Sequence, residues 1–174
     1  MKRNINVIRD LNGNQIVVIN DIRFKGKRNI DWNEVEHYLK QYIGEFFEIA
    51  QSKDIIYIGN DLPDEFTGSR CTAQLNGMRA KAKANAAQGI PEMIEIASNK
   101  RFKKNLEKKH GMNAKFGWYR YDSRFALPVF DDDGEVLRYN LFKVELVIRH
   151  AENKKLYLYD VVNVRKETST PLEQ

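Results

Sequence analysis

The stretch that decides the fold is WYRYDSRFALPVFDDDGEVLRYNLFKVELVIRH, residues 118–150. Apolar and polar residues alternate on both sides of the DDDG turn, and the alternation resumes in LYLYDVVNVRK, residues 156–166. Alternation with a period of two is typical of half-buried strands, and short turns between such strands indicate antiparallel neighbours. We therefore predict a β-meander in the C-terminal part of the chain.

The first part of the chain predicts a hairpin and then a helix. INVIRD (5–10) and QIVVINDIRF (15–24) flank LNGN, and Asn-Gly is a strong signal for a tight turn. Asp31 and Glu34 have the spacing of a capping box at a helix start. The apolar residues that follow recur at helical intervals: Trp32, Val35, Leu39, Tyr42, Ile43 and Phe46.

Further helices are expected before the meander. DIIYIGND (54–61) reads as a short buried strand, and residues 70–87 are rich in good helix formers. Residues 91–98 begin with a proline suited to a first helical turn, and the basic segment 99–110 should be a fourth helix that Gly111 ends. The predicted fold is α+β, with an N-terminal hairpin and helices followed by a four-stranded antiparallel β-meander.

Length and composition bound the protein class. A chain of 174 residues fits a single domain, 1–174, and 42% hydrophobic against 30% charged residues is the balance of a soluble globular protein. No apolar stretch approaches the roughly 20 residues of a membrane span, so we expect no membrane contact. Cys71 is the single cysteine, so no disulfide can form within the chain and a cytoplasmic location is expected.

The charge distribution favours an anionic partner. The net charge is +5, and residues 99–110 alone carry six cations against Glu107, which also gives +5. No glycine-rich phosphate loop and no metal-ligand spacing occurs, so we expect no cofactor and no metal. A nuclease built from this sequence would have to work on RNA, whose 2′-hydroxyl can act as an internal nucleophile.

Sorting the strands by parity gathers cations and aromatic rings on one side of the sheet. That side would carry Arg120, Arg124, Lys143, Arg149 and Arg165 together with Trp118, Tyr157 and Tyr159. Arginine and aromatic side chains in this mixture suit single-stranded nucleic acid. The alternative is an ordinary solvated face on which Asp122 and Glu145 pair with some of the cations.

His150 is the one histidine with a catalytic interpretation. It ends the middle strand beside Arg149, and imidazole titrates near neutral pH. Its parity follows Ile148, however, so it would point toward the core, where a lone histidine is more often a hydrogen-bonded structural residue.

Three stretches resemble a known domain family: KAKANAAQGIPEMIEIA, GWYRYDSRFALPVF and LYLYDVVNVRKETSTPL. The family occurs in bacterial mobile elements and prophages and belongs to the barnase, EndoU, colicin and RelE-like nuclease superfamily. The resemblance runs from about Ile30 to Leu172. It implies helices followed by a four-stranded antiparallel sheet, and metal-independent RNA cleavage through a 2′,3′-cyclic phosphate.

The resemblance also implies a site. His150 would act as general base or acid, Arg120 and Lys166 would hold the scissile phosphate, and Thr168 would position it. The expected substrate-binding residues are Arg124, Lys143, Arg149, Tyr157, Tyr159 and Arg165. Family members often carry an aromatic–histidine pair where this chain has Phe142 and Lys143, so a second base is missing here.

Two other functions stay open. The domain could be a catalytically inactive nucleic-acid-binding or phage-associated accessory module, which would bind RNA in a salt-dependent way without cutting it. The basic segment 99–110 could instead bind an acidic partner, such as an immunity protein that neutralises a toxin.

Overall fold

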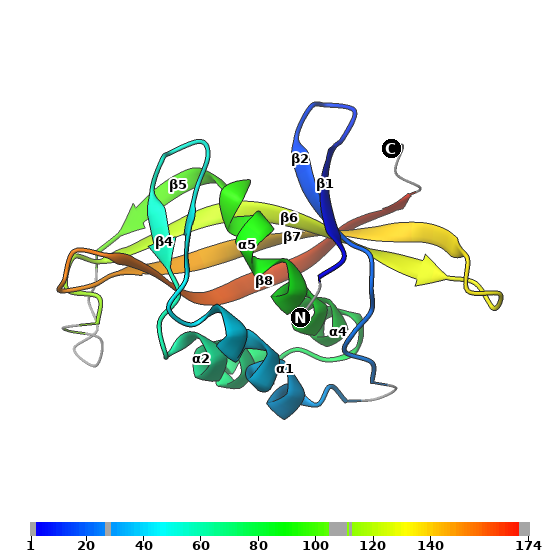
Figure 1. Cartoon of the computed structure of the whole chain (residues 1–174), viewed down its shortest axis with the longest axis horizontal. Coiled ribbons are helices and arrows are strands. Elements are labelled where there is room, and N and C mark those ends of the chain that lie inside the picture. The colour runs from blue at the N-terminus through cyan, green and yellow to red at the C-terminus, as the bar shows by residue number, and fades with distance from the viewer. Residues whose placement is uncertain (1–2, 27–28, 105–110, 112, 171–174) are drawn as a thin grey trace.

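The computed structural model describes residues 3–26, 29–104, 111 and 113–170, with the backbone alone for 168–170. Within these ranges eight strands form one mixed sheet, which curls into a half-barrel (Figure 1). The strand order is β1-β2-β6-β7-β8-β4-β3, and β5 pairs with β6 beside this path. The strands are β1 (Ile5–Arg9), β2 (Gln15–Ile19), β3 (Phe46–Glu48), β4 (Ile55–Tyr57), β5 (Ser98–Lys103), β6 (Trp118–Phe130), β7 (Val136–His150) and β8 (Leu156–Thr170).

The helices lie between β2 and β5 in the chain. They are α1 (Trp32–Leu39), α2 (Leu62–Gly68), α3 (Arg70–Ala73), α4 (Gly77–Ala86) and α5 (Ile90–Glu95), with 3-10 turns at Lys40–Tyr42 and Ala87–Gly89. Asp31 caps α1 as predicted, because its carboxylate accepts a hydrogen bond from the Asn33 amide at 3.1 Å. Among these helices, none combines the length and apolar character that a membrane span requires.

The core lies between the helices and one face of the sheet, here called the helix-covered face. Tyr121, Phe125, Phe142, Leu146 and Leu158 contribute to it from the three long strands, and all are buried. The Phe125 and Phe142 rings stack with their centroids 5.2 Å apart. Apolar residues from all the longer helices complete this cluster: Val35, Leu39, Leu62, Phe66, Ala82, Ala86, Ile90 and Met93.

The opposite face, here called the open face, carries the other parity. Its side chains are Arg101, Lys103, Trp118, Arg120, Asp122, Arg124, Lys143, Glu145, Arg149, Tyr157, Tyr159, Arg165 and Glu167. The three meander strands pair antiparallel in a register that puts polar residue opposite polar residue. The three predicted meander strands and the placement of their cations and aromatic rings on one face are therefore confirmed, but the parity of β8 shifts at bulges, where Val162 lies opposite Glu145 and Val161 takes the core position.

The predicted fold of helices followed by a four-stranded antiparallel meander is nevertheless wrong. The N-terminal hairpin exists, but it joins the meander through parallel pairing of Val17 with Phe125. The β3–β4 hairpin joins the other edge through parallel pairing of Ile56 with Leu156. These contacts link segments about a hundred residues apart, and alternation within one strand does not specify which edge it will meet.

The helical region predicted at residues 70–87 is confirmed in part, and the basic helix predicted at residues 99–110 is wrong where the structure describes it. Residues 70–87 form two helices, because the chain turns between Ala73 and Gly77, and Gly77 adopts a φ of 55°. Residues 98–103 form β5 at the edge of β6 rather than a basic helix. Residues 105–110 of that segment lie outside the described residues, so the acidic partner expected for it stays a prediction.

Candidate functional site

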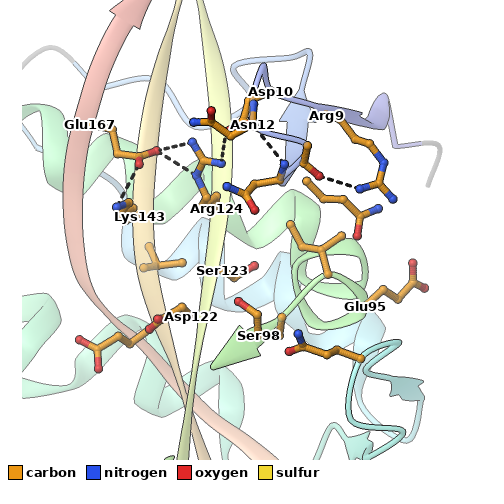
Figure 2. Close-up of a pocket in the computed structure, with 18 of the residues that line it drawn as sticks. Arg9, Asp10, Asn12, Glu95, Ser98, Asp122, Ser123, Arg124, Lys143 and Glu167 are labelled. Atoms are coloured by element: carbon orange, nitrogen blue, oxygen red, sulfur yellow. Dashed lines mark hydrogen bonds and ion pairs between the residues drawn. The ribbon is translucent and has the colours of Figure 1, made fainter. Parts of the chain in front are cut away.

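Arg124, Lys143 and Arg165 form a rung of three cations across the open face. Arg124 is paired with Lys143 in the β6–β7 register, and Lys143 is paired with Arg165 in the β7–β8 register. All three line a groove of about 710 Å³. Its walls are the β1–β2 turn, residues 9–15, and the junction between α5 and β5, residues 95–98 (Figure 2).

Arg124 is held by carboxylates on both sides. Its Nη1 donates to Asp10 of the β1–β2 turn at 2.8 Å, and its Nε donates to Glu167 of β8 at 3.0 Å (Figure 2). Burial disfavours the charge, but these hydrogen bonds outweigh it and raise the pKa of Arg124. The same hydrogen bond lowers the pKa of Asp10. Arg124 therefore fixes the turn to the sheet and has little capacity left for a ligand anion.

The other two cations of the rung are more available. Lys143 is 63% exposed and shares Glu167 with Arg124 at a distance of 3.3 Å. Arg165 is exposed and has no carboxylate partner in the described part of the chain. Anion binding at this end of the face therefore depends on Lys143 and Arg165.

The middle of the open face is neutralised. Arg101 bridges Asp122 and Glu145 with contacts of 2.9 Å each, and Arg120 lies 3.4 Å from Glu145. Burial alone would raise the pKa of Glu145. Hydrogen bonds from Asn163, Arg101 and Arg120 together outweigh this effect, so the pKa is lowered. This is the ion pairing expected for an ordinary solvated face, and it applies to this central region.

An aromatic cluster occupies the other end of the open face: Phe46, Tyr57, Trp118, Tyr157 and Tyr159. Its rings form two groups of contacts, one with centroid distances of 5.6 Å for Phe46–Tyr57 and 5.9 Å for Tyr57–Tyr157, and the other with 5.0 Å for Trp118–Tyr159. Two cations lie over these rings: the Arg149 guanidinium is 4.2 Å from the Tyr157 centroid, and Lys155 is 4.8 Å from that of Tyr57. Phe46 is 60% exposed and offers a ring surface to solvent.

The structure brings the six predicted substrate-binding residues onto one face, in two groups. Arg124, Lys143 and Arg165 form the rung, whereas Arg149, Tyr157 and Tyr159 belong to the aromatic end. Sequence reasoning missed Phe46, Tyr57 and Lys155. Phe46 and Tyr57 reach the site only because β4 pairs with β8, and no local signal in the sequence indicates that pairing.

The predicted catalytic residues are not brought together. His150 lies on the helix-covered side of its strand, where its ring contacts Tyr119 at 5.9 Å and its Nε2 lies 3.1 Å from the Lys154 carbonyl. Arg120 lies on the open face. Lys166 pairs with Phe142, and the run of strand from there to His150 spans about 26 Å. Thr168 pairs with Leu141 through its backbone, and its side chain lies outside the described residues.

A buried ion pair lies apart from the open face. Lys83 of α4 has no exposed surface and contacts Asp160 of β8 at 2.8 Å, beside the hydroxyl groups of Thr72 and Ser69. Burial lowers the pKa of Lys83 and raises that of Asp160. Every polar atom of this group has a partner, and its place between helices and sheet indicates a structural role.

The described residues contain no group of His, Cys, Asp and Glu side chains placed to hold a metal ion. Comparisons with protein-family models, with curated proteins and with solved structures found no match to this chain. The resemblance to nucleases of mobile elements therefore stays a prediction.

Proposed function

We propose that the open face binds single-stranded RNA without cleaving it. The observation that supports this is the placement of the cation rung and the aromatic cluster on the same face of β6, β7 and β8. Phosphates would contact Lys143 and Arg165, while unstacked bases would lie on Phe46 and the neighbouring rings. From Lys143 to Arg149, β7 spans about 20 Å. An extended single-stranded RNA of a few nucleotides covers the same length.

The position of His150 supports binding over cleavage. Metal-independent cleavage needs a base and a cation within hydrogen-bond reach of one phosphate. His150 faces away from Arg120, and its ring nitrogen is in contact with a carbonyl of its own hairpin. The preference for RNA over DNA comes from the family resemblance, and a reducing cytoplasm is the compartment we propose for the protein.

Binding can be measured by fluorescence anisotropy with a labelled 15-nucleotide RNA at 0.1 M salt. Arg165→Gln should weaken binding about fivefold, because one phosphate contact is lost. The matched control is Arg79→Gln, an exposed arginine of α4, which should change the affinity less than twofold. Equal effects of the two substitutions would contradict RNA binding by the open face.

Cleavage is tested on the same RNA in the presence of EDTA. Intact RNA after incubation with an excess of protein is the expected result. Strand scission that disappears in His150→Ala would replace our proposal with a ribonuclease. Labelled DNA of the same sequence provides the comparison for sugar preference, and binding equal to that of RNA would contradict the preference for RNA.

A further inference from the structure

The edge of β6 has a gap in its strand pairing. Its register with β5 ends at Ser98 opposite Asp122, and its register with β2 begins at Val17 opposite Phe125. At residues 123–124, no strand of the described chain pairs with β6 on this side. The groove of about 710 Å³ opens at this gap, directly beside the cation rung (Figure 2).

Four amide side chains line the groove, and most of them are exposed. None of them has a hydrogen bond through its side-chain amide to any residue that the structure describes: Asn12, Asn14, Gln15 and Gln51. Ser98 adds a hydroxyl without a partner in the same ranges, and no aromatic ring lines the groove. A ligand here would be recognised by hydrogen bonds rather than by stacking.

We propose that this groove takes one unstacked nucleobase of the bound RNA, with the adjoining phosphate on Lys143 and Arg165. Asn and Gln amides present a donor and an acceptor together, which matches the paired groups on the edge of a base. The volume lies within the usual range of about 300–1,000 Å³ for small-molecule sites. Of the carboxylates that line the groove, Asp10 and Glu167 are held by Arg124, and Asp122 and Glu145 by Arg101, so the acid without a cation partner in the described chain is Glu95 at the α5–β5 junction. This inference rests on the proposed function and names a base-recognition pocket within it.

The pocket can be tested with single nucleotides, separately from the long RNA. The probes are AMP, CMP, GMP and UMP, with ribose 5-phosphate as the base-free control, titrated into ¹⁵N-labelled protein. At least one nucleotide should bind fivefold or more tighter than ribose 5-phosphate and should shift the side-chain amide signals of Asn14 and Gln51. If none of the four binds tighter than ribose 5-phosphate, the pocket is refuted.

Substitutions distinguish this inference from the proposed function. Asn14→Ala and Gln51→Ala should each weaken the preferred nucleotide about fivefold and leave ribose 5-phosphate unchanged, whereas the control Gln74→Ala, on an exposed residue after α3, should change neither. If these variants bind the 15-nucleotide RNA and the nucleotides as the wild type does, the pocket is refuted and RNA binding stands. If the nucleotides bind as expected but the long RNA does not, the pocket stands and the proposed function fails.

Discussion

Salt dependence gives the sharpest test of the proposal that the open face binds RNA. Three cations of this face and Lys155, which lies over the Tyr57 ring at its aromatic end, have no carboxylate partner of their own in the described chain; the three are Lys103, Lys143 and Arg165. For single strands, the logarithm of affinity falls with the logarithm of salt concentration at about 0.7 per neutralised phosphate. Four contacts therefore give a slope of about −2.8, and affinity should fall about fiftyfold between 50 and 200 mM salt.

The alternative to four phosphate contacts is that every cation of the open face contacts an RNA phosphate. Arg101, Arg120, Arg124 and Arg149 would raise the number of contacts to about eight and the slope to about −5.6, a loss of about 2,000-fold over the same range. These four arginines already neutralise carboxylates in ion pairs of 2.8–3.4 Å, so RNA would displace few counterions from them.

The assay is fluorescence anisotropy of the 15-nucleotide RNA at several salt concentrations from 50 to 200 mM. Arg165→Gln should reduce the slope to about −2.1, because one phosphate contact is removed. A slope steeper than about −4, or a slope unchanged in Arg165→Gln, would refute the assignment of phosphate contacts to the cations that lack their own carboxylate.

Three further outcomes follow from the contacts described. Phe46→Ala should weaken RNA binding by about 1–3 kcal/mol, the usual loss for one stacked base, with little change in the midpoint of urea unfolding, since the ring is 60% exposed; unchanged affinity would exclude Phe46 as a stacking surface. Lys83→Met should lower the free energy of unfolding by about 3–5 kcal/mol by leaving Asp160 charged and buried, and adding Asp160→Leu should restore most of it; a double variant as unstable as the single one would contradict this. The pKa of Asp10 is lowered by its hydrogen bond from Arg124, so the unfolded chain binds more protons in acid, and this contribution to stability is present above about pH 4 and lost as the pH falls below it. Urea unfolding at pH 6 and pH 3 should therefore show a smaller acid loss for Asp10→Asn than for the wild type, and equal losses would count against the link.

The sequence allowed the composition of the open face to be predicted but not its boundaries. Period-two alternation is a property of each strand alone, so it placed Arg124, Lys143 and Arg165 on one face correctly. The residues that complete or neutralise the site come from other segments. Asp10 reaches Arg124 from the β1–β2 turn, and Phe46 reaches the aromatic cluster through the β3–β4 hairpin. Both contacts depend on parallel pairings between distant segments, which local patterns do not encode.

The basic segment 99–110 illustrates why net charge is a weak guide to the binding surface here. It carries a charge equal to the whole excess of the chain, yet its first two cations are already bound within the protein. Lys100 pairs with Asp54 at 2.9 Å, and Arg101 bridges Asp122 and Glu145. Lys103 lies on the same face as Arg101, but it pairs with Trp118 rather than with Arg120, and it has no carboxylate partner in the described chain. A single segment thus stabilises the sheet through some of its cations and supplies the aromatic end of the open face with another, so the phosphate contacts must be counted from individual ion pairs.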